Sequence, residues 1–294
     1  MPDRRVTEAL NWLRDTKDRF REFAYGQRST EATAPPKIGL ALAGGFARGI
    51  AHIGVLKVFR DAGIPIHCVA GTSVGALIGA GYCAGVPLEK MEEIGKGTTF
   101  ADFGRWTPSW LGLANNLRME RYLARITDIK NFEDLKVPLA ISATDINAGV
   151  TVYYSSGGIA VPLRASCAYP GLFVPIQFEG RTLVDGFLTA PVPVEGALLL
   201  GADIVVAVYL ESGGIENPRT AVDIISRSFN IIQKHADISW RQQADVIIEP
   251  DVSAFAWDDF TKTPELVAAG EAAALRAMPD VIAALRGEKK NSAA

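Results

Sequence analysis

The sequence is poor in cysteine and histidine, with three of each among 294 residues. Cys68, Cys83 and Cys167 are far apart and form no C-x-x-C pair, so neither a disulfide framework nor a zinc site is indicated. Cys68 and Cys83 lie in apolar runs, which predicts buried thiols and a reducing compartment. We expect no metal ion and no other cofactor.

An excess of charge of one sign is also absent. The net charge is −3, and acidic and basic residues are mixed without a basic block, which argues against nucleic acid as a partner. Residues 1–5 are polar with no apolar run after them, which argues against a secretory signal. The longest apolar stretch, residues 192–210, is interrupted by Glu195 and Asp203 and predicts a helix and a strand instead of a membrane span. We expect a cytoplasmic protein, with peripheral contact to a membrane surface left open.

Hydrophobic residues are plentiful, at 48% of the total, which is enough for one large core. From residue 37, short apolar runs alternate with helical segments. The expected strands are 37–43, 68–70, 137–144, 151–154, 181–184, 203–209 and 246–249, and the expected helices include 50–62, 74–84, 194–200 and 220–243. Runs that are apolar throughout, such as 204–208, are typical of a sheet covered on both faces. The pattern predicts an α/β fold with a mostly parallel central sheet flanked by helices on both faces.

Three parts of the chain differ in character. Residues 1–36 predict an amphipathic helix and a linker, with the helix either packed on the body or lying at a lipid interface. Residues 37–250 hold the α/β pattern, and residues 251–294 form a C-terminal helical extension. Residues 88–135 interrupt the pattern with aromatic side chains, which form a satellite core, line an acyl pocket or build a lid.

The strongest functional signal is the G-x-S-x-G pattern from Gly71 to Gly75. It follows an expected strand and precedes an expected helix, and a serine on such a tight turn presents its hydroxyl above the edge of the sheet. The two glycines leave room for a strained backbone and for a substrate. Ser73 is therefore a candidate nucleophile.

A glycine-rich loop after the first strand is the second signal. Gly44, Gly45 and Phe46 precede Arg48 and Gly49 and open a helix, so their N–H groups can converge on an oxyanion. A nucleotide-phosphate loop or a simple tight turn is the alternative. The phosphate loop is disfavoured because the loop lacks the G-x-G-x-x-G spacing and no Gly-Lys-Ser/Thr follows.

The base that would serve Ser73 is not an obvious histidine. His52, His67 and His235 fall in or beside helical and strand patterns, away from the loop position of a triad base. Asp185 ends an expected strand and precedes Gly186, which places a carboxylate at a strand end. On local sequence, Asp185 is either a base or the first residue of an Asp-Gly turn.

Taken together, the glycine-rich loop, the G-x-S-x-G turn and Asp185-Gly186 resemble the patatin-like phospholipase family. The stretches 49–56, 143–147 and 165–173 are also similar to its bacterial members, so the resemblance covers roughly residues 37–250. It implies a three-layer α/β/α fold and a serine carboxylic-ester hydrolase acting on fatty-acyl esters of lipids or related esters without a metal. It also implies a dyad of Ser73 as nucleophile and Asp185 as base.

Further residues take roles by the same resemblance. The backbone of Gly44, Gly45 and Phe46 would form the oxyanion hole, and Arg48 would shape the loop and attract an anionic headgroup. The chain departs from the family pattern at Phe46, where a third glycine is usual, and at Phe187, where Gly or Ala is usual. These departures predict a narrower, more apolar site. A catalytically weak lipid-binding or regulatory protein on the same fold, a nucleotide-binding protein and a transacylase stay open as alternatives, and the sequence does not indicate an oligomeric state.

Overall fold

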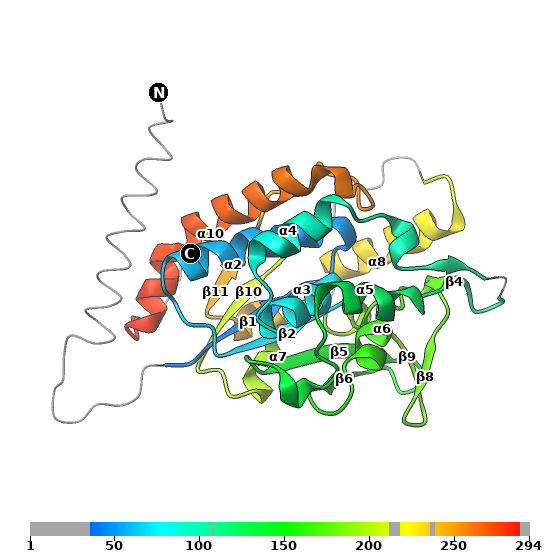
Figure 1. The fold of residues 1–294 in the computed structure, drawn as a ribbon, viewed down its shortest axis with the longest axis horizontal. Helices are drawn as coiled ribbons and strands as arrows, with labels where there is room; N and C mark the ends of the chain where they lie inside the picture. Colours follow the sequence, from blue (N-terminus) through cyan, green and yellow to red (C-terminus); the bar gives the residue numbers. More distant parts are fainter. Residues whose placement is uncertain (1–35, 108, 212–217, 236–238, 289–294) are drawn as a thin grey trace.

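The computed structural model describes residues 36–107, 109–211, 218–235 and 239–288. Its centre is an eight-stranded sheet (Figure 1). The strands are β1 (Ile38–Leu42), β2 (Cys68–Gly71), β5 (Leu139–Asp145), β6 (Val150–Tyr154), β8 (Ile176–Phe178), β9 (Arg181–Asp185), β10 (Ile204–Val208) and β11 (Val246–Ile248). The order is β11-β10-β1-β2-β5-β9-β8, with β6 also paired to β5. Neighbours from β11 to β5 are parallel, whereas β6, β8 and β9 pair antiparallel, so the predicted mostly parallel sheet is confirmed.

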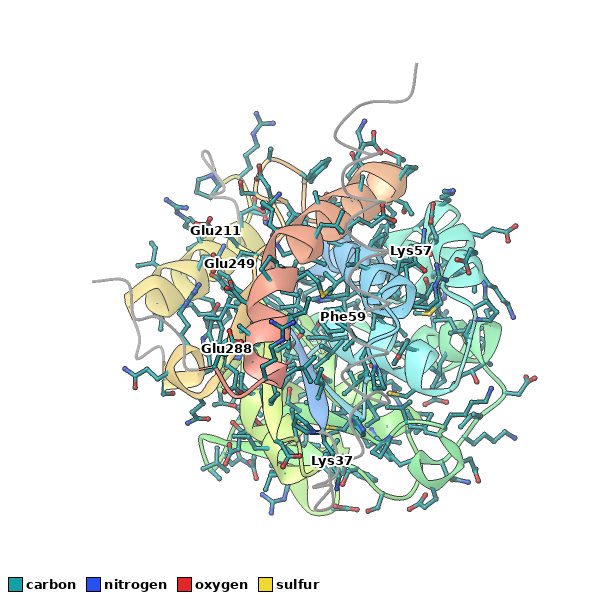
Figure 2. The ribbon with its side chains drawn as sticks, turned by 90° about the vertical axis from the view of Figure 1, so that its left-hand side faces the viewer. Lys37, Lys57, Phe59, Glu211, Glu249 and Glu288 are labelled. Atoms are coloured by element: carbon teal, nitrogen blue, oxygen red, sulfur yellow. The ribbon has the colours of Figure 1, made fainter. Side chains whose placement is uncertain are left out.

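Helices cover both faces of the sheet. One face carries α2 (Ala51–Asp61), α3 (Val74–Cys83), α4 (Leu88–Lys96), α6 (Ala160–Ser166) and α10 (Thr263–Leu285), and the other carries α7 (Val194–Leu199) and α9 (Ser239–Gln243). Seen from the side, α10 lies across the end of the molecule next to Phe59 of α2 (Figure 2). No helix in the described ranges combines the length and the apolar character needed to cross a bilayer.

The pleat of the strands divides the core in two. Along β1, Ile38, Leu40 and Leu42 belong to the large core under α2 and α3, whereas Ala41 belongs to a smaller core under α7. The smaller core is rich in alanine and valine, and short side chains let α7 approach the sheet closely. A strand buried on both sides has no polar alternation, which is why these segments are apolar throughout in the sequence.

The segment 88–135 contains more regular structure than its sequence predicts. It includes α4, α5 (Arg118–Ile126), β3 (Arg105–Trp106) and β4 (Gly112–Asn115). The last two strands form a small sheet with β7 (Gly171–Phe173), in the order β3-β4-β7. The expected helix 220–243 contains α8 (Ala221–His235) and α9, with 236–238 outside the described residues. The amphipathic helix expected in residues 1–36 also lies outside them, apart from residue 36.

Candidate active site

Ser73 occupies a sharp turn between β2 and α3. Its backbone has φ 54° and ψ −123°, in the left-handed half of conformational space that a non-glycine residue rarely adopts. The turn also lies tight against the end of β1, because a Cβ on Gly75 would collide with the carbonyl oxygen of Leu42. The strain is thus at Ser73 itself, whereas Gly75 permits close packing, and Gly71 ends β2 just before the turn.

Three hydroxyl groups fix this turn. The Ser73 N–H donates to Ser166 Oγ of α6 at 2.8 Å. Thr72 Oγ1 donates to the Ala190 carbonyl at 2.7 Å and lies 2.6 Å from Ser142 Oγ of β5. No sequence motif assigns these hydroxyls a role; the only signal for Ser166 is that it falls in the 165–173 stretch, which is similar to bacterial members of the family.

Asp185 reaches Ser73 through the pairing of the sheet. Gly71 at the end of β2 is opposite Ile141 of β5, and Asp185 at the end of β9 is opposite Ala143 of β5. Strand β6 pairs with both Ile141 and Ala143 and therefore occupies one edge of β5 at these positions. Because β5 has only two edges, β2 and β9 share the other one. Since β2 runs parallel and β9 antiparallel to β5, their carboxyl ends meet on that edge. Gly186 follows directly in the short helix η4 (Gly186–Leu188).

The Asp185 carboxyl is almost fully buried, with 1% of the residue exposed. Its Oδ1 accepts the Phe187 N–H at 2.9 Å. Burial raises the pKa of this carboxyl to about 7, because hydrogen bonds from the Phe187 N–H and the Ser73 hydroxyl stabilise the charged form only in part. A carboxylate with a pKa near neutrality is a far better proton acceptor than an exposed aspartate.

The glycine-rich loop lies beside Ser73. Its helical part, η1 (Phe46–Ile50), packs directly on the start of α3, because a Cβ on Gly49 would collide with the Val74 side chain. The Gly44 N–H donates to the Pro191 carbonyl over a long 3.4 Å. Within the described part of the chain, the N–H groups of Gly45 and Phe46 have no acceptor. Two donors are thus available next to the serine.

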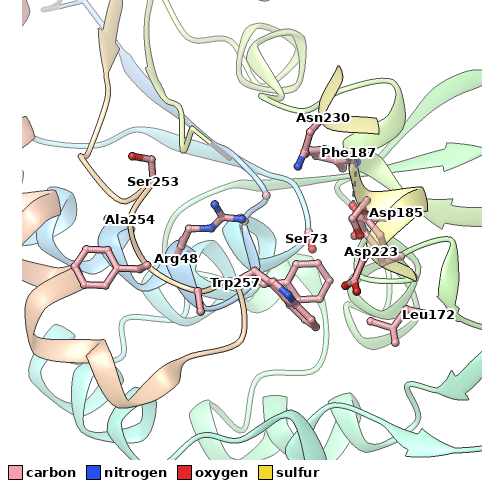
Figure 3. A pocket seen from close by; sticks show the side chains of 17 residues that line it. Arg48, Ser73, Leu172, Asp185, Phe187, Asp223, Asn230, Ser253, Ala254 and Trp257 are labelled. Atoms are coloured by element: carbon pink, nitrogen blue, oxygen red, sulfur yellow. Dashed lines mark hydrogen bonds between the residues drawn. The ribbon is translucent and has the colours of Figure 1, made fainter. Parts of the chain in front are cut away.

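Ser73, Asp185 and the loop line one cavity of about 310 Å³, here called the main cavity (Figure 3). In this view the Ser73 side chain lies between Arg48 and Asp185. The other walls come from α8 and from residues 253–257, including Trp257. These walls were not predictable from the sequence, because neither α8 nor residues 253–257 carry a motif.

Arg48 is buried in the cavity wall. Its Nη1 donates to the Glu211 carbonyl at 3.4 Å, and its Nε has no partner within the described ranges. Burial lowers the pKa of the guanidinium, in line with a cation held away from water. A guanidinium with a spare donor in a cavity is suited to bind an anionic group.

Phe46 and Phe187 take different positions around the site. The Phe46 ring packs edge-on against Tyr169 and Trp257, at centroid distances of 5.4 and 4.9 Å. It lines the main cavity and also a second, apolar one. The Phe187 side chain lines the main cavity. Its backbone N–H donates to Asp185 Oδ1, and its carbonyl accepts a hydrogen bond from Gln233 Nε2 at 2.9 Å. Both rings therefore make the site more apolar, and Phe46 forms part of the wall of both cavities.

The second cavity extends from Ser73 into the core. Its apolar lining includes Phe46, Val74, Leu77, Phe100, Phe103, Met119, Phe173, Trp257 and Phe260. A third, deeper cavity shares Phe103 and Phe260 with it. Two of the aromatic residues of the segment 88–135, Phe100 and Phe103, thus face a cavity at the serine, whereas Trp106 and Trp110 are exposed.

His52 and His67 make hydrogen bonds to backbone groups and not to Ser73. His52 Nε2 donates to the Ala43 carbonyl at 2.9 Å, and burial lowers the pKa of His52 to about 4. His67 Nδ1 accepts the Ile38 N–H at 3.1 Å. The His235 side chain lies outside the described residues. All three cysteines are free and buried, and the described ranges hold no group of His, Cys, Asp and Glu suited to a metal ion.

Comparisons with known proteins show the family of the chain. Residues 40–198, more than half of the chain, match the family model described as patatin-like phospholipase. An uncharacterized NTE family protein of Mycobacterium tuberculosis is 35% identical over 181 residues, which is 60% of this chain and 50% of that protein. Lysophospholipase nte1 of Emericella nidulans is 32% identical over 207 residues, which is 67% of this chain and 13% of that protein.

A solved structure shares the fold. The crystal structure of VipD from Legionella pneumophila superimposes with a TM-score of 0.55 at 15% identity and covers 84% of this chain and 67% of VipD. The chain spans about half the length of the mycobacterial relative and a smaller share of the fungal one.

Proposed function

The chain belongs to the patatin-like phospholipase family, and from that premise we propose that it hydrolyses fatty-acyl esters of lipids, with Ser73 as nucleophile and Asp185 as general base. One observation carries the proposal: a strained serine and a buried carboxyl whose pKa is about 7 line the same cavity, beside two unpaired backbone N–H groups of the described residues. Nucleophile, base and oxyanion donors are the three elements that acyl transfer requires.

The steps follow from this arrangement. Asp185 accepts the hydroxyl proton while Ser73 Oγ attacks the ester carbonyl carbon. The N–H groups of Gly45 and Phe46 stabilise the negative oxygen of the tetrahedral intermediate, and the positive end of the α3 dipole adds to this stabilisation. The intermediate collapses, the alcohol leaves with the proton from Asp185, and an acyl-serine remains. Water gives a proton to Asp185 as it attacks the acyl-serine, and a second tetrahedral intermediate forms. When this intermediate collapses, Asp185 returns the proton to Ser73 Oγ, the bond between Ser73 and the acyl group breaks, and the fatty acid is released.

The two cavities suggest how an ester lies. The apolar cavity lined by Phe100, Phe103 and Phe260 suits the acyl chain. The main cavity, with Arg48 in its wall, suits the alcohol and an anionic headgroup. We therefore propose lysophospholipids, with one acyl chain and a phosphate, as the substrate class. A relative named lysophospholipase supports this choice.

Turnover of p-nitrophenyl esters tests the dyad. Wild type should hydrolyse them, and Ser73→Ala and Asp185→Asn should each lose at least about a thousandfold in kcat, as is usual when a nucleophile or its base is removed. Ser228→Ala, on the exposed side of α8, is the matched control and should keep full activity. Unchanged turnover in either dyad variant would refute the assignment.

A fluorophosphonate probe adds a second readout. The probe should label Ser73 in the folded wild type and should not label Ser73→Ala. A folded wild type that takes no label and turns over no ester would instead be a lipid-binding protein on this fold. Release of free fatty acid, measured against transfer of the acyl group to an added alcohol, separates a hydrolase from a transacylase.

A further inference from the structure

The hairpin formed by β3 and β4 (residues 105–115, with 108 outside the described residues) exposes large apolar side chains. Trp110 is fully exposed, Trp106 is 68% exposed and Leu111 is 66% exposed. Leu113 of the same hairpin and Leu117 just after it are also exposed. The hairpin lies at the side of the molecule where α8 also lies (Figure 1). Such a cluster of large apolar side chains in water marks an interaction surface.

The charge around the hairpin differs from that of the whole chain. Residues 105–125 contain four arginines and one glutamate, whereas the chain as a whole has a net charge of −3. The glutamate, Glu120, pairs with Arg164 from outside the segment at 2.8 Å. Arg105 and Arg121 are exposed and have no acidic partner among the described residues. Exposed tryptophans beside free arginines fit a lipid interface with anionic headgroups.

An apolar path joins the hairpin to Ser73. The Trp106 ring lies 6.2 Å from Phe100, and Phe100 stacks on Phe173 at 5.9 Å. Phe100 and Phe173 both line the apolar cavity that also contains Ser73. The strands support this continuity, because β4 pairs with β7, whose Leu172 lines the main cavity.

We propose that the 105–115 hairpin docks the protein on a lipid bilayer containing anionic lipids. Trp106, Trp110 and Leu111 lie among the headgroups, while Arg105 and Arg121 face lipid phosphates. The path through Phe100 and Phe173 then leads an acyl chain from the bilayer to Ser73 without crossing water. Docking itself does not depend on hydrolysis. Only the passage of an acyl chain from the bilayer to Ser73 rests on the proposed function.

Vesicle flotation with the full chain tests the proposal, using vesicles of phosphatidylcholine with or without phosphatidylglycerol. Trp110→Ser should bind both kinds about tenfold more weakly, the effect of losing one well-buried aromatic side chain. Arg121→Gln should bind only the anionic vesicles more weakly, by about fivefold. Leu199→Ser is the matched control, since Leu199 is 67% exposed on α7 at the other face of the sheet, and its binding should be unchanged.

Several results would overturn docking by the hairpin. These are a wild type that does not float with vesicles, a Trp110→Ser variant that binds as tightly as wild type, and an equal loss in Leu199→Ser. Gel filtration in which Trp110→Ser dissociates an oligomer would assign the hairpin to a second copy of the chain. Ser73→Ala should float like wild type, and Trp110→Ser should keep its turnover of a soluble short-chain ester. Failure of docking and failure of the hydrolase assignment therefore give different results.

Discussion

Ser73 lies in the turn that follows β2, Asp185 is the last residue of β9, and these two strands approach each other from opposite directions along one edge of β5. This relationship puts the carboxyl beneath the turn of the serine and removes it from water, with 1% of the residue exposed. The same burial that brings the proposed base to its serine also sets the pKa of the base.

The rate should depend on pH with a midpoint near 7. Below that pH the Asp185 carboxyl is protonated and cannot accept the proton of Ser73, so kcat/KM for a soluble ester should fall about tenfold per pH unit. Above the midpoint the rate should reach a plateau. The measurement is a pH profile of kcat/KM with a short-chain p-nitrophenyl ester. A midpoint near 4 would mean that the base is exposed to solvent and is not the buried Asp185.

Stability should fall as pH rises through the same range. The folded carboxyl has a pKa of about 7, whereas an unfolded aspartate titrates near 3.9, so the folded state binds more protons between these values and loses stability as they leave. Asp185→Asn removes this titration. The free energy of unfolding of Asp185→Asn, minus that of wild type, should therefore increase by roughly 3 kcal/mol from pH 5 to pH 8.

Urea unfolding at the two pH values measures this change. Ser73→Ala is the control, because it keeps the carboxyl and should keep the decline with pH. A difference between Asp185→Asn and wild type that is constant with pH would contradict a raised pKa in the folded state.

Ser166 should act as a positioning residue for the nucleophile. Its Oγ accepts the buried Ser73 N–H at 2.8 Å, so Ser166→Ala leaves that donor without a partner and costs about 1–3 kcal/mol of stability. The turn should also relax, and kcat should fall more than KM rises. Urea unfolding and initial rates measure both effects. Equal stability and an unchanged kcat would show that the turn is held by Thr72 alone.

Phe103 should limit the length of the acyl chain. It lines both the apolar cavity at Ser73 and the deeper cavity, so Phe103→Ala should join the two. The ratio of kcat/KM for longer to shorter p-nitrophenyl esters should rise about fourfold for each methylene that enters the new space. Phe178→Ala, at the end of β8 and away from these cavities, is the matched control. An unchanged ratio in Phe103→Ala would place the acyl chain elsewhere.

Arg48 should favour substrates with an anionic headgroup. Comparing a lysophospholipid with a monoacylglycerol of the same chain length isolates this effect within one variant. Arg48→Gln should raise KM for the lysophospholipid about tenfold, because a charged hydrogen bond is worth about 1.5–3 kcal/mol. The ratio of kcat for the lysophospholipid to kcat for the monoacylglycerol should stay as in wild type. Equal effects on both substrates would assign Arg48 to the structure of the loop alone.

The sheet and the turn at Ser73 were predictable because their signals are local. Residues 68–84 contain an apolar strand, a serine between two glycines and an apolar helix, and each of these depends on neighbours within a few positions. The helix at 50–62 and the strand at 203–209 were found in the same way, to within a residue or two. The β3-β4 hairpin was missed because its strands have two and four residues, and because the residues of β4 do not alternate between polar and apolar in the sequence.

The surroundings of the dyad depend on contacts between distant segments. No pattern around Ser166 shows that its hydroxyl will meet the Ser73 N–H, and none around Trp257 places it beside the glycine-rich loop. The four aromatic residues of the segment 100–110 also look alike in sequence. Only packing turned Phe100 and Phe103 toward the cavity and left Trp106 and Trp110 in water.

By itself, the sequence determined the α/β fold, the strained turn that presents Ser73 and the glycine-rich loop, because short-range backbone preferences and apolar periodicity produce them. Only the tertiary structure decided that Asp185 lies next to that turn, since two strands must pair with one edge of β5 from opposite directions. It also decided the pKa of about 7, because that value depends on how completely the rest of the chain excludes water from one carboxyl group.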